Sequence, residues 1–178
     1  DRMEVRGRDS AGLGVIVWGT DLSGVMSQWS AQISARSTDP LFTNNSVRDA
    51  GGNLVFVYKA AAEIGELGDN TRNMRAAVAA DDVLRSAVAV PGARVTVLGH
   101  TRWASVGIIS EPNAHPVNGE ETGGTNPFVS VAVLNGDVDN HVDLRARHNL
   151  RFADPITTDA KVIPALRSEE HTSELQSH

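Results

Sequence analysis

The sequence predicts a layered domain of mixed helices and strands, α+β or α/β, for three reasons. Four short runs are rich in β-branched and other apolar residues, which is typical of buried strands. One longer stretch repeats its apolar residues at roughly helical spacing. No internal repeat or linker divides the 178 residues, which suffice for one domain with its own core.

The four predicted strands are short and bounded by turn-forming residues. Residues 12–18 (GLGVIVW) and 53–58 (NLVFVY) are the first two, and residues 94–98 (RVTVL) and 128–134 (FVSVAVL) are the third and fourth. Between the first two, residues 19–52 are rich in Ser, Thr, Asn, Asp and Gly and have weak periodicity. We therefore expect residues 19–52 to form a long loop or insertion.

Three helices are predicted, at residues 71–90, 140–149 and 160–166. In the first, apolar side chains recur at about helical spacing until Pro91-Gly92 ends the pattern. The last follows Thr157-Thr158-Asp159, where Asp159 is placed to cap the helix N-terminus. Mixed strands and helices of this kind favour a layered architecture.

Composition excludes several classes of protein. The chain is 40% hydrophobic and 21% charged, as an ordinary globular protein is, and its net charge of -6 argues against nucleic acid or an acidic membrane surface as a partner. No apolar run is long enough to span a bilayer, and no apolar leader follows the first residues, so we expect a cytoplasmic protein. There is no cysteine, which excludes disulfides, Cys-ligated zinc and a Cys nucleophile in the chain as given.

Polar residues of three useful kinds follow the predicted strands. Arg102 comes just after the third strand and could clamp a carboxylate or phosphate, although a lone Arg is more often in a structural salt bridge. Asn135 and Gly136 follow the fourth strand, where they could form a hairpin turn or offer an amide and a backbone N–H to an oxyanion. Asp159 could cap a helix or hold a substrate ammonium group.

A metal or cofactor site is not expected. His100, His115 and Asp137 could be imagined as metal ligands, but their spacing fits no compact zinc pattern. The run DVDNHVD at residues 137–143 lacks the Gly and Glu of a calcium loop. Ser10 lies outside a G-x-S-x-G elbow, which argues against a serine hydrolase.

The order of five short motifs is more specific than any one of them. RGRDSAG (6–12), HTRWAS (100–105), NAHP (113–116), NG (135–136) and TTD (157–159) follow one another in the chain. Together they strongly resemble the class II glutamine amidotransferase domain. Trp103 favours the hexosamine branch of that family, the glucosamine-6-phosphate synthases, over the purine-pathway members, which usually carry Tyr there.

The resemblance implies a fold and a reaction. The fold is an N-terminal nucleophile (Ntn) hydrolase sandwich with four layers, αββα, here incomplete. In the family an N-terminal Cys attacks the side-chain amide of glutamine, and the ammonia released aminates fructose 6-phosphate in a phosphosugar-isomerase domain. Glutamine and such a C-terminal domain are therefore the expected partners, together with homo-oligomer formation when full length, and no cofactor is implied.

The resemblance also implies roles for particular residues. Arg102 would hold the glutamine carboxylate and Asp159 its ammonium group. Asn135 and the N–H of Gly136 would form the oxyanion hole. The pocket would be shaped, and the substrate contacted, by three more residues, Trp103, Asn113 and His115.

Several departures from the family pattern bear on activity. The nucleophilic Cys is absent, so we expect the chain as given to be inactive. Leu134 replaces the His before Asn-Gly, and Ala160 and Lys161 replace the Thr-Glu after Asp159. Two other functions therefore stay open: an amidotransferase of the same class with another acceptor, or a catalytically dead domain that senses glutamine or serves as a scaffold.

The two ends of the chain are expected to be foreign or truncated. Residues 1–166 are assigned to a partial amidotransferase domain. Residues 167–178, RSEEHTSELQSH, resemble the translation of a sequencing adapter, and we expect them not to belong to the natural protein.

Overall fold

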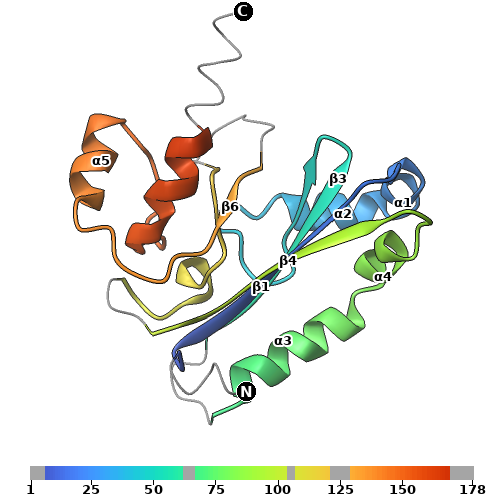
Figure 1. Cartoon of the computed structure of the whole chain (residues 1–178), viewed down its shortest axis with the longest axis horizontal. Helices are drawn as coiled ribbons and strands as arrows, with labels where there is room; N and C mark the ends of the chain where they lie inside the picture. Colours follow the sequence, from blue (N-terminus) through green and yellow to red (C-terminus); the bar gives the residue numbers. More distant parts are fainter. Residues whose placement is uncertain (1–6, 62–66, 104–106, 121–128, 169–178) are drawn as a thin grey trace, which may run out of the picture.

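The computed structural model describes residues 7–61, 67–103, 107–120 and 129–168 (Figure 1). These residues form a four-stranded sheet and a two-stranded sheet, both antiparallel, together with helices. The predicted mixture of helix and sheet in an α+β arrangement is confirmed.

The larger sheet has the strand order β2-β3-β1-β4. β1 (Ser10–Trp18) and β3 (Asn53–Ala60) are its inner strands, and β2 (Val47–Ala50) and β4 (Arg94–Arg102) are its edges. β1, β3 and β4 confirm three predicted strands. Each is longer than predicted, because pairing with a neighbouring strand continues the ladder into residues most of which have weak β propensity.

Four helices cover one face of this sheet: α1 (Ser23–Gln28), α2 (Ser30–Ser37), α3 (Asp69–Ala80) and α4 (Asp82–Val88) (Figure 1). Alternate side chains of β1 and β3 point toward them, because successive residues of a strand face opposite sides. The main hydrophobic core lies here. Its fully buried members include Val17, Leu54, Phe56, Tyr58 and Ala87.

Of the two alternatives predicted for residues 19–52, a long loop or an insertion, the long loop is wrong. The segment contains α1, α2 and β2, and Leu22, Val25, Ile33 and Val47 are all buried in the main core. The helices are short and each buries a single side chain within its bounds, so the many Ser and Gln residues on their outer faces hide the apolar pattern.

The single helix predicted at residues 71–90 is two helices, α3 and α4, which meet at Asp81. The Asp81 backbone is extended, with φ −85° and ψ 98°, and its carboxylate accepts a hydrogen bond from Leu84 N at 3.0 Å, as an N-cap does. The same carboxylate accepts from the Tyr58 hydroxyl at 2.6 Å and from two nitrogens of Arg36 at 3.0 and 2.5 Å. Asp81 therefore ends one helix, starts the next and ties both to α2 and β3.

The other face of the larger sheet is covered by β5 (Val117–Asn118) and β6 (Val131–Ala132). The strand predicted at residues 128–134 is confirmed only over β6, and Phe128 lies outside the described residues. A second apolar cluster lies on this face. Its members are Phe42, Val55 and Val57, with Ile16, Ala50, Val129 and Val131 packed against them.

Gly12 allows the segment around His115 to lie directly on β1. A Cβ atom at Gly12 would be 1.8 Å from the His115 carbonyl oxygen, and one at Gly14 would be 3.1 Å from Pro116. No larger side chain fits at Gly12 without moving that segment. The close approach brings residues 113–116 against the strand that pairs with β4.

α5 (His141–Arg147) and a final helix at residues 162–168 lie on the far side of the molecule from α3 and α4 (Figure 1). α5 and the final helix confirm the predictions of helices at residues 140–149 and 160–166. Both helices pack around Leu150, Val162 and Ala165. The final helix includes Arg167 and Ser168, the first two residues of the adapter-like run, and the other ten lie outside the described residues. Among the helices that the structure describes, none has the length and apolar character to cross a membrane.

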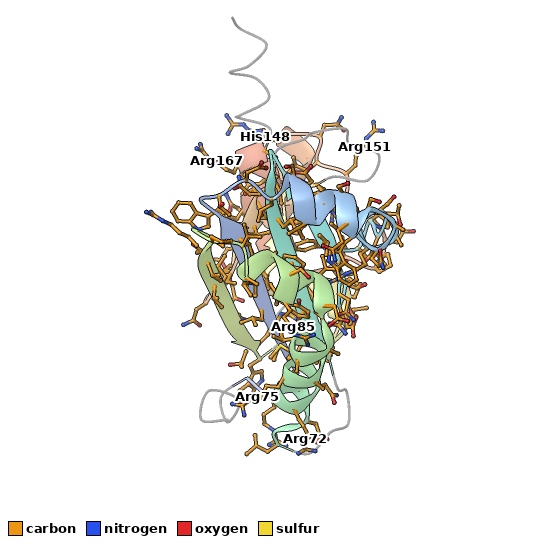
Figure 2. All side chains as sticks on the ribbon, turned by 90° about the vertical axis from the view of Figure 1, so that its right-hand side faces the viewer. Arg72, Arg75, Arg85, His148, Arg151 and Arg167 are labelled. Atoms are coloured by element: carbon orange, nitrogen blue, oxygen red, sulfur yellow. The ribbon has the colours of Figure 1, made fainter. Side chains whose placement is uncertain are left out.

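Six basic residues are labelled in Figure 2, and they lie in two separate groups. Arg72, Arg75 and Arg85 lie along α3 and α4, and His148, Arg151 and Arg167 lie at the opposite end (Figure 2). Arg72 and Arg85 each pair with an acidic residue three positions earlier on the same helix. These labelled residues do not form one continuous basic face.

Candidate functional site

A pocket of about 250 Å³ lies where β4 ends and the loops after β6 and before the final helix meet it. It brings together six of the seven residues that were predicted as a site. They are Arg102, Trp103, His115, Asn135, Gly136 and Asp159. The seventh, Asn113, does not line the pocket.

Arg102 is the last residue of β4, so the register of the sheet fixes its backbone opposite Ser10. Its side chain is only 6% exposed, and one of its nitrogens donates to the Ile108 carbonyl at 3.5 Å. Burial lowers the pKa of Arg102, while the carboxylates of Asp159 and Asp9 act in the opposite direction. The guanidinium is thus a buried cation in the pocket wall.

Asp159 is not the helix cap that the sequence suggested. It begins a short 3-10 turn at Asp159–Lys161 whose N-cap is Thr158, and the Thr158 side chain makes no capping bond. The Asp159 carboxylate, 5% exposed, instead accepts a hydrogen bond from Val138 N at 2.5 Å. It therefore joins the turn before the final helix to the loop that follows β6.

Asn135 and Gly136 form the exposed rim of the pocket. The hairpin alternative is wrong, because the chain continues from this bend toward α5 and not into a paired strand. Gly136 has φ +148°, a backbone conformation that residues with a side chain rarely adopt. No atom lies within 4 Å of the place where its Cβ would be. Glycine is thus favoured at position 136 by the backbone conformation and not by a lack of space for a side chain.

His115 is a buried, uncharged imidazole. Its Nδ1 accepts a hydrogen bond from Leu134 N at 3.2 Å, and its ring centroid lies 4.6 Å from that of His100. Burial is the largest cause that lowers the pKa of His115 to about 3, and His100, Arg102 and Lys59 act in the same direction. Burial also lowers the pKa of His100. Neither ring is therefore expected to carry charge at neutral pH.

Asn113 is completely buried and holds the backbone behind the pocket. Its Oδ1 accepts from Thr157 N at 2.7 Å and Thr158 N at 2.8 Å. Its Nδ2 donates to the Pro155 carbonyl and to Ser110 Oγ, both at 2.8 Å. All four bonds are made within the protein, so this amide positions the segment that leads into Asp159.

Trp103 lies at the mouth of the pocket and is 72% exposed. His100, Asp137 and Thr158 also line the pocket, although they were not predicted as ligand contacts. His100 could have been found from the strand period, because it stands two residues before Arg102 on the same face of β4. Asp137 and Thr158 carry no comparable signal of their own; each is simply the sequence neighbour of a predicted residue, Gly136 or Asp159.

The imagined metal ligands His100, His115 and Asp137 all line this one pocket. Among the described residues, however, no group of three His, Cys, Asp or Glu side chains is arranged to hold a metal ion. One buried cation, one buried carboxylate and uncharged donors at the rim complement a small molecule that carries both charges.

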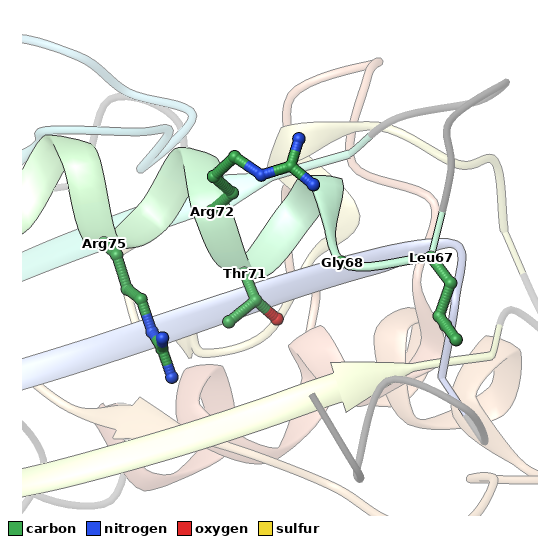
Figure 3. Close-up of a pocket in the computed structure, with 5 residues that line it drawn as sticks. All are labelled: Leu67, Gly68, Thr71, Arg72 and Arg75. Carbon is green, nitrogen blue, oxygen red and sulfur yellow. The ribbon is translucent and has the colours of Figure 1, made fainter.

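A second hollow, at the start of α3, offers no comparable set of groups. It is lined by Leu67, Gly68, Thr71, Arg72 and Arg75. Figure 3 shows the guanidinium groups of Arg72 and Arg75 pointing to different sides of the helix. Arg72 also pairs with Asp69 at 3.0 Å. These groups therefore do not converge on a common ligand.

No family model matches the chain. Over 95 residues, 51% of the chain, it is 34% identical to glutamine–fructose-6-phosphate aminotransferase [isomerizing] of Streptococcus agalactiae serotype III (strain NEM316). It is 33% identical over the same length to the protein of that name from serotype V (strain ATCC BAA-611 / 2603 V/R). In both comparisons the match spans 15% of the relative's length. The chain is thus similar to a small part of a glutamine-utilising enzyme.

Proposed function

We propose that this chain is the glutamine-binding part of an amidotransferase that releases ammonia from the glutamine side chain for amination of fructose 6-phosphate. The observation that carries the proposal is the pocket. Arg102 and Asp159 supply buried charges of opposite sign, and Asn135 and Gly136 supply uncharged groups at the rim. The similarity to glutamine–fructose-6-phosphate aminotransferase supports the choice of substrate.

Each part of glutamine has a complementary group in this arrangement. The α-carboxylate binds Arg102 through two parallel hydrogen bonds, and the α-ammonium binds Asp159. The side-chain amide then extends toward Asn135 and the Gly136 N–H, which would stabilise negative charge on its oxygen during attack by a nucleophile supplied from outside these 178 residues. A pocket of about 250 Å³ is large enough to hold one amino acid.

The fold belongs to the same proposal. An antiparallel sheet covered by helices on one face and by a second small sheet on the other is compatible with an incomplete Ntn αββα sandwich. Residues 1–166 would form this partial domain. Because the relatives are far longer than the match, a phosphosugar-isomerase domain elsewhere in a longer protein would receive the ammonia.

Binding of L-glutamine to the 178-residue chain tests the proposal by isothermal titration calorimetry. We expect Arg102→Gln to weaken binding by about 10- to 100-fold, since hydrogen bonds to charged groups contribute about 1.5–3 kcal/mol. Arg94→Gln is the matched control, because Arg94 is at the other end of β4 and exposed. Absence of glutamine binding by the wild-type chain, or equal effects of the two substitutions, would refute the proposal.

The 178 residues contain no cysteine, which is consistent with a second candidate function. With no thiol in the chain, a domain that binds glutamine without hydrolysing it is the sensing or scaffold alternative. We predict that these 178 residues release no ammonia from glutamine in a glutamate-dehydrogenase-coupled assay. If the chain belonged to an amidotransferase with another acceptor, we would also expect no ammonia release from these 178 residues. The identity of the acceptor domain would distinguish that function from the proposed one.

A further inference from the structure

We propose that Asn113 and His115 are positioning residues, each of which holds one wall of the pocket in place. Asn113 fixes the wall that carries Asp159, and His115 fixes the wall that carries Asn135 and Gly136. The ligand-binding readout of this inference rests on the proposed function, but its structural readouts do not.

The Asn113 wall depends on both ends of one amide group. Oδ1 accepts from the N–H groups of Thr157 and Thr158, the two residues immediately before Asp159. Nδ2 donates to the Pro155 carbonyl on the other side of the same segment. Only Asn supplies an acceptor and a donor at these places, since Asp lacks the donor and Leu lacks both.

The His115 wall depends on one tautomer of the imidazole. Leu134 N donates to His115 Nδ1, so Nδ1 carries no proton and the ring hydrogen is on Nε2. Burial and the neighbouring His100 and Arg102 keep the ring uncharged, so this bond persists over the physiological pH range. Because Leu134 immediately precedes Asn135, the bond fixes the backbone that presents the rim.

The segment that bears both side chains has a rigid base. Residues 113–115 are all buried, and the His115 carbonyl lies against Gly12 of β1. The two walls also meet directly, where the Asp159 carboxylate accepts from Val138 N. Asn113 and His115 thus keep the Asp159 carboxylate and the rim at Asn135 at a fixed distance from each other. A ligand that contacts both must match that distance.

The wild-type chain alone tests the His115 assignment. In 15N NMR spectra of the histidine rings recorded from pH 5.5 to 8, we expect the signal of His115 Nδ1 to be that of an unprotonated nitrogen. The signal of His115 Nε2 should be that of a protonated nitrogen. A proton on Nδ1, or a charged ring in this range, would overturn the assignment without reference to any ligand.

Two substitutions of His115 separate its two nitrogens. In His115→Asn the amide oxygen can reach the place of Nδ1, whereas in His115→Gln the amide lies near the place of Nε2. We expect the Leu134 amide to be protected from hydrogen exchange in His115→Asn and to exchange at least tenfold faster in His115→Gln. Glutamine should bind more tightly to His115→Asn. The reverse order, or equal exchange, would contradict positioning through Nδ1.

Asn113→Ala tests the other wall, with the exposed Asn140→Ala as its control. We expect at least tenfold faster exchange of the Thr157 and Thr158 amides and at least tenfold weaker glutamine binding in Asn113→Ala alone. Unchanged exchange at both amides would overturn the role of Asn113. If wild-type protein bound no glutamine, the proposed function would fail while the exchange results still decided the positioning.

Discussion

Replacing each of the two lysines by methionine should change stability in opposite directions, because their buried amines have different surroundings. Lys59 and Lys161 are the only lysines of the chain, and both are almost completely buried. Lys161 Nζ donates to the Asn118 carbonyl and Asn118 Oδ1 at 2.7 Å and to the Glu120 carbonyl at 2.9 Å. Among the described residues, Lys59 Nζ has no hydrogen-bond partner.

The magnitudes follow from these contacts. Lys161→Met leaves three acceptors, two of them in buried bonds, without their charged donor, and removing one partner of a buried charged network costs about 3–5 kcal/mol. Lys59→Met removes an amine that makes no hydrogen bond among the described residues; it lies 5.3 Å from the centre of the Phe42 ring and is attracted by the carboxylates of Asp39 and Glu111. An unpaired buried charge is costly, so this substitution should stabilise the fold by about 1–4 kcal/mol at pH 7.

Stability should also depend on pH through Lys59. Burial is the main cause that lowers the pKa of Lys59 from 10.5 to about 7, and Lys161 adds to it. Between these two values the unfolded chain binds the proton and the folded chain does not. The folded state therefore gains stability as pH rises from about 7 to about 10 and loses it as pH falls, by about 1.4 kcal/mol per pH unit.

Urea unfolding followed by tryptophan fluorescence measures both effects. The advantage of Lys59→Met over the wild type should be smaller by about 2 kcal/mol at pH 9 than at pH 7. A loss below about 1 kcal/mol for Lys161→Met would refute the reasoning, because it would mean that its three bonds contribute little. Destabilisation by Lys59→Met, or a difference independent of pH, would refute it for the unpaired amine.

Two further substitutions test the packing that supports the site. Tyr58→Phe removes the hydroxyl that donates to Asp81 at 2.6 Å and should lower the free energy of unfolding by about 1–3 kcal/mol in urea; no change would show that the bond contributes nothing. Gly12→Ala should cost at least about 3 kcal/mol, since its Cβ would overlap the His115 carbonyl. Gly24→Ala is its control, because open space surrounds Gly24 in α1, and it should stabilise by about 0.5–1 kcal/mol in the same experiment.

The inner strands could be predicted because their side chains carry the signal themselves. The run of β-branched residues in β1 and β3 exists because both strands are buried in the sheet. The ends of β4 could not be predicted in this way. Gly99 and His100 have no strong strand preference and are extended because β1 pairs with this part of β4.

The segment 19–52 and the junction at Asp81 show what the sequence left undetermined. Short helices that bury one side chain each give no measurable period. The helical spacing on both sides of Asp81 suggested one continuous helix. The Asp81 partners Arg36 and Tyr58, 45 and 23 residues away, decide the break, and no local pattern indicates them.

The candidate site was largely predictable from its motifs, but the roles within it were not. The order of short motifs indicated six residues that the structure gathers in one pocket. It did not distinguish Asn113, whose amide faces the protein backbone, from residues that face the cavity. That distinction depends on which way a side chain points, which spacing alone does not determine.

A crystal structure of the chain with L-glutamine would test the central claim most directly. The account predicts glutamine in the pocket, with its carboxylate on Arg102, its ammonium on Asp159 and its side-chain amide toward Asn135 and Gly136. An empty pocket at saturating glutamine, or glutamine bound with its carboxylate away from Arg102, would contradict it.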